Sequence, residues 1–127
     1  MLEFLLLFVA LTLLFTIVPI ASLYKITKAL YHRSFRELKV WFYSTARTID
    51  IFGNVIAADL FNDTLIKRKG YRFGRRGETI SSVIGKNYRD GTLTRVGSGL
   101  RKTLDFIDED HSMKSILSEE QINQSKI

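Results

Sequence analysis

The hydrophobic residues of this chain are concentrated at its amino end. The stretch from Phe4 to Tyr24 contains no charged side chain. At 1.5 Å of rise per residue, a helix of that length spans about 30 Å, which is the thickness of a bilayer's hydrocarbon core. A cleaved signal peptide is the alternative, but no Lys or Arg precedes the stretch, and the apolar run is longer than a signal core. We therefore expect a retained transmembrane helix over residues 1–24, with Tyr24 as an aromatic anchor at the interface.

The next segment, residues 25–48, has apolar positions at helical spacing with Lys and Arg between them. It predicts an amphipathic juxtamembrane helix. Such a helix either lies in the membrane interface or continues the transmembrane helix as a stalk that packs against later helices. Three consecutive aromatic residues in this segment are further candidate interface anchors: Trp41, Phe42 and Tyr43.

The remaining pattern predicts a small helical domain over residues 49–117. Its first helix, over residues 49–66, has one apolar face, formed by Ile49, Phe52, Ile56 and Leu60 with Val55 and Phe61. The chain becomes polar after Ser118, and we expect residues 118–127 to be a disordered tail. The predicted fold class is all-α: a single N-terminal transmembrane helix followed by a small, membrane-proximal helical domain.

Threonine and glycine residues indicate where the helices of this domain begin and end. Glu78 and Thr79 suit the first turn of one helix, and Thr92 or Thr94 can cap the last strong one. Gly85 is a plausible C-terminal stop for the helix between them.

Charge is distributed unevenly along the chain. The net charge is +6, from 19 Lys and Arg against 13 Asp and Glu. Residues 67–102 hold most of the basic side chains, and the acidic ones prevail after them. The chain has no cysteine, which excludes disulfides, thiol catalysis and cysteine-bound zinc, and its two histidines lack metal-ligand spacing. We expect no cofactor and no metal.

A basic loop is the strongest functional signal in the sequence. Gly70, Gly74 and Gly77 punctuate residues 67–77 and indicate a loop. Its candidate docking residues are Lys67, Arg68, Lys69, Arg72, Arg75 and Arg76. They can bind anionic lipid, an acidic protein surface or nucleic acid, with Tyr71 or Phe73 stacking on bases, or they can simply be solvated. Anionic lipid or a protein partner is favoured, because no element matches a groove-reading motif.

Catalytic motifs are weak in this sequence. Asp59 and Asp63 stand four residues apart, but paired carboxylates on a helix are usually a solvated face. The Gly85-Lys86 pair lacks the remaining residues of a phosphate-binding loop. We therefore expect a protein that is not an enzyme.

Part of the chain resembles a group of small, uncharacterised phage and prophage proteins. The matching residues are Asn54-Val55-Ile56, then Glu78-Thr79-Ile80-Ser81, and finally Ile107-Asp108 with His111. The resemblance covers about residues 50–115, with departures at Val83, where the group often has Arg, and Ser112, where it often has Cys. The group has no established activity, so the resemblance implies only a phage origin.

These observations together predict a structural integral membrane protein. We expect it to be phage-encoded and to be a minor protein of a virion with an internal lipid membrane. Its basic domain would dock on the membrane surface and on a capsid shell or neighbouring copies. The alternatives are a holin-like lysis protein, or a membrane-anchored nucleic-acid-binding protein whose soluble part binds DNA in a salt-dependent manner.

The orientation in the membrane is the first testable prediction. The positive-inside rule places the C-terminal domain in the cytoplasm and the short N-terminus outside, because basic residues follow the apolar stretch closely. A single cysteine introduced into residues 118–127 is therefore expected to resist a membrane-impermeant thiol reagent in intact cells and to react after lysis. Labelling in intact cells would contradict this orientation.

Overall fold

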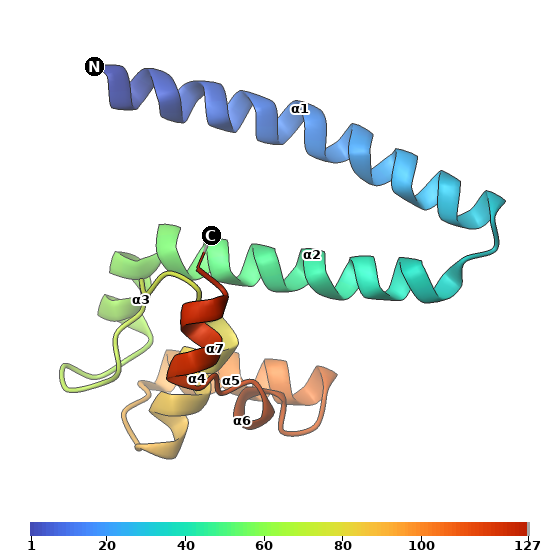
Figure 1. The fold of residues 1–127 in the computed structure, drawn as a ribbon. Coiled ribbons are helices and arrows are strands. Elements are labelled where there is room, and N and C mark those ends of the chain that lie inside the picture. Colours follow the sequence, from blue (N-terminus) through green and yellow to red (C-terminus); the bar gives the residue numbers. More distant parts are fainter. Residues whose placement is uncertain (127) are drawn as a thin grey trace. The chain divides into compact units, whose positions relative to one another are not determined.

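The computed structural model describes residues 1–126, which are helical with no strand. This confirms the all-α fold class. The chain divides into two compact units, Met1–Ser44 and Thr45–Ile127, called here the N-terminal and C-terminal units. The seven described helices are shown in Figure 1.

Helix α1, Leu2–Tyr31, is the long apolar helix of the N-terminal unit (Figure 1, blue). It has the length and composition of a membrane-spanning helix, and its most apolar 18-residue window is not buried against the rest of the protein. The helix continues beyond the predicted end at Tyr24. It also accommodates Pro19 internally, as membrane helices often do.

A tight turn over residues 32–34 ends α1 and divides the predicted juxtamembrane helix. Arg33 has the left-handed φ of +52°, and its N–H donates to the Leu30 carbonyl. The Ser34 N–H donates to the Ala29 carbonyl over 2.8 Å. These two bonds form a Schellman motif, which closes a helix by satisfying its last carbonyls. The prediction of one helix over residues 25–48 was therefore wrong: residues 25–31 belong to α1.

Helix α2, Phe35–Ile56, begins after this turn and runs past the predicted boundary at residue 48. A break at Ala57 then separates it from α3, Ala58–Thr64. The C-terminal unit also contains α4, Ile80–Arg89, and α5, Arg95–Ile107. Thr94, one of the two predicted candidates, caps α5 with its side chain. Thr79 caps α4 and therefore precedes the helix, whereas the sequence placed it in the first turn. Two short helices follow: α6, His111–Lys114, and α7, Glu119–Gln124.

The core of the C-terminal unit is small and lies where α4, α5 and α6 meet the segments around them (Figure 1). Its buried apolar residues are Leu65, Ile66, Phe73, Val83, Ile84 and Leu93. Residues 66 and 93 also form an isolated antiparallel bridge, which ties the end of the α3 segment to the start of α5.

Two glycines allow the helices to approach closely. A Cβ on Gly85 would lie 2.1 Å from the Ser112 carbonyl oxygen, and one on Gly97 would lie 2.1 Å from that of Leu65. Gly85 is therefore a packing residue in the middle of α4, and its prediction as a helix stop was wrong. Gly97 permits α5 to rest directly on the backbone after α3.

The predicted disordered tail is ordered over residues 118–126, whereas Ile127 lies outside the described residues. Ser118 and Gln121 form a reciprocal capping box that starts α7. Ile122 is fully buried, and the Ser125 hydroxyl accepts a hydrogen bond from Arg47 over 2.9 Å. The polar composition of the tail concealed these contacts, because a single buried isoleucine and one cap are enough to dock a helix of six residues.

Three asparagines hold the loop between α3 and α4 in place. Asn87 and Asn62 each pair with both backbone groups of one loop residue, Tyr71 and Phe73 respectively, over 2.8–3.2 Å. Asn54, fully buried on α2, accepts from the Gly74 N–H and donates to the carbonyls of Arg75 and Glu78. These side-chain amides supply the hydrogen bonds that a neighbouring strand would otherwise provide.

Replacing Asn54 with Ala is therefore expected to destabilise the C-terminal unit. It leaves buried backbone groups of the loop without partners, at a cost of about 1–3 kcal/mol for each unsatisfied group. Urea unfolding of the full chain in detergent micelles, followed by pulse proteolysis, measures the loss. The matched control is Asn123→Ala, because Asn123 is exposed on α7. Equal stability of the two variants would contradict the anchoring role.

Candidate functional site

The basic loop presents five of its six predicted docking residues to solvent. Within residues 1–126, four of them form neither an ion pair nor a side-chain hydrogen bond: Arg68, Lys69, Arg72 and Arg76. Lys67 is exposed and donates to the Gly91 carbonyl over 3.0 Å. Because the backbone beneath is pinned by asparagines, these cations are displayed from an ordered surface.

Arg75 is the exception among the six. Its guanidinium is bidentate to Glu119 on α7 and also donates to the Tyr71 hydroxyl over 3.3 Å. The hydrogen bonds from Arg75 lower the pKa of Glu119 below its usual value. Arg75 therefore joins the loop to α7, and it is less available for a partner than its five neighbours.

A buried ion pair lies beneath the loop. The Lys86 ammonium on α4 is 2.6 Å from a Glu78 carboxylate oxygen, and the Glu78 side chain is fully buried. The same carboxylate accepts hydrogen bonds from the hydroxyls of Tyr71 and Ser82, both over 2.8 Å. Lys86 also lies 4.3 Å above the Tyr71 ring. The sequence placed Glu78 only in the first turn of a helix and did not anticipate this pair.

This polar cluster holds the loop on α4. Among the described residues, every buried side-chain nitrogen and oxygen has a hydrogen-bond partner. Both oxygens of the Glu78 carboxylate are engaged, and the Ser82 hydroxyl also accepts from the Leu117 N–H over 2.9 Å. The hydrogen bonds of Glu78 and Ser82 therefore join the loop, α4 and the segment before α7.

The two aromatic residues of the loop are part of the domain's interior. Phe73 is buried in the core, with its ring centroid 5.3 Å from that of Phe61. Tyr71 is half-buried and points its hydroxyl at Glu78. Neither ring is freely displayed for stacking on nucleic-acid bases, which the sequence had left as an alternative.

A second surface of the C-terminal unit is apolar and exposed. The face that the spacing predicted on residues 49–66 lies across α2 and α3. Two of its six members, Val55 and Phe61, are half-buried, and Phe61 packs on the core. The other four, Ile49, Phe52, Ile56 and Leu60, are exposed. Their exposed fractions range from 49% to 66%. The other side of α2 supplies Asp50 and Asn54 to the domain's interior. Helix α2 thus packs by the side that carries Asp50 and Asn54, and most of the predicted apolar face stays open.

The predicted interface anchors lie in the N-terminal unit. Tyr24, Phe42 and Tyr43 are exposed, whereas Trp41 is half-buried and its ring lies 5.2 Å from that of Phe42. Successive residues of an α-helix point about 100° apart. Trp41, Phe42 and Tyr43 therefore do not form one face of α2, although each can contact lipid separately.

Two carboxyl groups of the C-terminal unit, Asp50 and Asp105, have pKa values shifted in opposite directions. Asp50 accepts from the Ile80 N–H and the Ser81 hydroxyl at the start of α4, but desolvation by burial raises its pKa above the usual value. Desolvation also opposes ionisation of Asp105, yet two hydrogen bonds from Ser112 and the nearby Arg101 bring its pKa below the usual value. Both acids link helices that are separate in sequence.

Several residues of the phage and prophage pattern, and its departure Ser112, have structural partners here. Asn54 anchors the loop, Glu78 is in the buried pair, and Thr79 caps α4. His111 lies 3.1 Å from Asp108, and Ser112 is fully buried against Asp105. Each of these residues thus has a role in holding the C-terminal unit together.

Known proteins add no further assignment. No protein-family model, curated protein or solved structure matches this chain. Within residues 1–126, no group of three or more His, Asp and Glu side chains is placed to hold a metal ion. The physical features of the two units are therefore the basis for a functional proposal.

The buried ion pair yields a double-mutant prediction. Replacing Glu78 with Gln leaves the Lys86 charge buried without its partner, which is expected to cost about 3–5 kcal/mol of unfolding free energy. The pair Glu78→Gln with Lys86→Met removes both charges and is expected to recover most of that loss. Urea unfolding of the full chain in micelles, measured by pulse proteolysis, gives the three values.

The exposed pair of Arg89 and Asp90 is the control for this cycle. Its atoms lie 2.9 Å apart, but both side chains are about half exposed. Arg89→Ala is expected to change the unfolding free energy far less than Glu78→Gln, because water already solvates an exposed pair. If the losses of unfolding free energy from the changes at positions 78 and 86 simply add in the double variant, the two buried charges do not stabilise each other, and the prediction is contradicted.

Proposed function

We propose that this chain is a single-pass structural membrane protein whose C-terminal unit is a docking module on the cytoplasmic side. One observation carries the proposal: a long apolar helix with an unburied surface precedes a small domain whose uncommitted charge is displayed outward. The interior polar groups of that domain are used in its own architecture. Docking, rather than chemistry on a bound substrate, is the activity that such a distribution of groups supports.

The basic loop is the proposed contact with anionic lipid. Its four unpaired cations are Arg68, Lys69, Arg72 and Arg76, and each Lys or Arg near an anionic surface contributes about 1 kcal/mol. The apolar face of Ile49, Phe52, Ile56 and Leu60 is the proposed contact with neighbouring copies or a capsid shell. Exposed apolar area of this kind is typical of interaction surfaces.

The setting that we propose is a phage virion with an internal lipid membrane. A minor protein with one membrane helix and a basic cytoplasmic face would connect the lipid layer to the shell around it. We expect mass spectrometry of purified virions to detect the chain. Its absence from the particle would remove the virion role and leave a host-membrane protein, as a holin-like function would require.

Contact between the loop and lipid is tested with a single spin label. The chain has no cysteine, so Lys69→Cys gives one labelling site in the full chain. In nanodiscs, a nickel chelate on the lipid headgroups is expected to broaden the nitroxide signal more on anionic than on zwitterionic bilayers. Salt near 1 M should remove the difference, because the Debye length is then about 3 Å.

Charge-reversal variants distinguish an effect of the loop's own cations from an effect of the protein's net charge. Arg72→Glu with Arg76→Glu is expected to abolish the broadening that anionic lipid causes. The matched control, Arg95→Glu with Lys102→Glu, changes the net charge equally at exposed residues of α5. Equal broadening on the two bilayers would show that lipid is not the partner of the loop and would favour a protein surface.

A further inference from the structure

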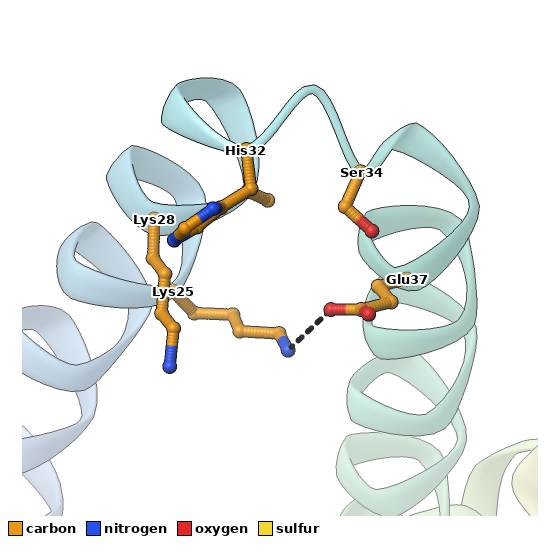
Figure 2. Close-up of a pocket in the computed structure, with 6 residues that line it drawn as sticks. Lys25, Lys28, His32, Ser34 and Glu37 are labelled. Carbon is orange, nitrogen blue, oxygen red and sulfur yellow. Dashed lines mark ion pairs between the residues drawn. The ribbon is translucent and has the colours of Figure 1, made fainter.

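The N-terminal unit contains a pocket where α1 turns into α2. Its volume is about 460 Å³, and its lining residues are Lys25, Lys28, Ala29, His32, Ser34 and Glu37. Figure 2 shows Lys25 and Lys28 on the α1 side of this elbow, opposite Ser34 and Glu37 at the start of α2. The Schellman turn at Arg33 creates the pocket, because it reverses the chain over residues 32–34.

The pocket is cationic and only partly neutralised. Lys25 and Glu37 approach to 3.8 Å, the one ion pair between its lining residues. Within residues 1–126, Lys28 has no carboxylate partner, and its ammonium lies 6.0 Å above the Tyr24 ring. The amino end of α2 adds a positive dipole at the wall that Ser34 and Glu37 form. These groups together are suited to a phosphate.

The position of the pocket along α1 indicates where that phosphate comes from. The uncharged stretch ends at Tyr24, so Lys25 and Lys28 follow it within about 6 Å at 1.5 Å per residue. The polar headgroup layer occupies roughly 5–8 Å on each side of the hydrocarbon core. If α1 spans the bilayer, both ammonium groups therefore lie at the depth of lipid phosphates.

We propose that this pocket binds the phosphodiester of an anionic phospholipid that has a hydroxyl-bearing headgroup, such as phosphatidylglycerol. Lys25 and Lys28 contact the phosphate, and the Ser34 hydroxyl donates to it. The Glu37 carboxylate accepts a hydrogen bond from a headgroup hydroxyl, which gives this acid a role beside an anionic ligand. The inference rests on the proposed insertion of α1, but it does not depend on the basic loop of the C-terminal unit.

Native mass spectrometry of the full chain in detergent micelles tests the site. Lys25→Gln with Lys28→Gln is expected to lower the affinity for phosphatidylglycerol by about tenfold or more. The matched control is Arg36→Gln with Lys39→Gln, which removes the same charge from exposed positions of α2 outside the pocket lining. That control is expected to change the affinity less than about threefold. Equal losses in the two variants would overturn the proposal.

Further arms identify the source of the ligand and its headgroup. Inorganic phosphate at the same concentration is expected not to displace the lipid, and displacement would assign the pocket to free phosphate instead. Phosphatidylethanolamine is expected to bind more weakly, because its ammonium replaces the hydroxyls and adds a positive charge near two lysines. Binding equal to that of phosphatidylglycerol would overturn the headgroup assignment.

Carbonate extraction of membranes separates this proposal from the one on which it rests. Retention of the chain in the membrane, together with equal lipid affinity of the pocket and control variants, would overturn only the pocket. Release of the chain by carbonate would overturn both the insertion of α1 and the lipid site. Retention of the chain in the membrane, together with a loss of lipid affinity in the pocket variant alone, supports both the insertion of α1 and the lipid site.

Discussion

The C-terminal unit depends on satisfying the backbone of a loop that packs on α4 without a neighbouring strand. Residues 70–78 run beside α4 and carry Phe73 into the core, so their N–H and C=O groups need partners away from water. Asn54, Asn62 and Asn87 provide those partners from three different helical segments. Because each amide both donates and accepts, one side chain can satisfy a loop residue on both of its backbone groups.

This constraint also explains why the basic residues are available. The inward-facing positions of the loop are occupied by Tyr71 and Phe73, and the buried charge of Glu78 is matched by Lys86. The other cations of the loop, apart from Arg75, face solvent on a backbone that asparagines hold. An ordered cationic surface loses less conformational entropy on binding than a free loop would. That difference favours docking as the role of the domain.

The N-terminal unit follows a different rule. In the apolar part of α1, the backbone hydrogen bonds are internal to the helix, and its most apolar window is not buried against other segments. The turn at Arg33 then brings the basic end of α1 beside the first turn of α2, where Glu37 pairs with Lys25. The pocket between them arises from chain reversal, so its residues are close in sequence even though they belong to two helices.

The sequence predicted best those features that depend on a single local property of the chain. Apolar length indicated the long helix α1, and Thr79 and Thr94 stood within one residue of two helix starts, because a helix start depends mainly on the residues of its own turn. The left-handed turn at Arg33 was missed, since no glycine marks it. Residues 118–126 were also misjudged, because the burial of Ile122 depends on a partner surface that polarity along the chain cannot reveal.

By itself, the sequence determined the helical class, the apolar helix and the cluster of basic residues. The tertiary structure decided which of those residues remain free. Arg75 is tied to Glu119, and Lys86 is paired inside the domain with Glu78, whereas Arg72 and Arg76 stay exposed. The physical reason is that charge follows from residue type alone, but pairing and burial depend on distances between segments that lie far apart in the chain.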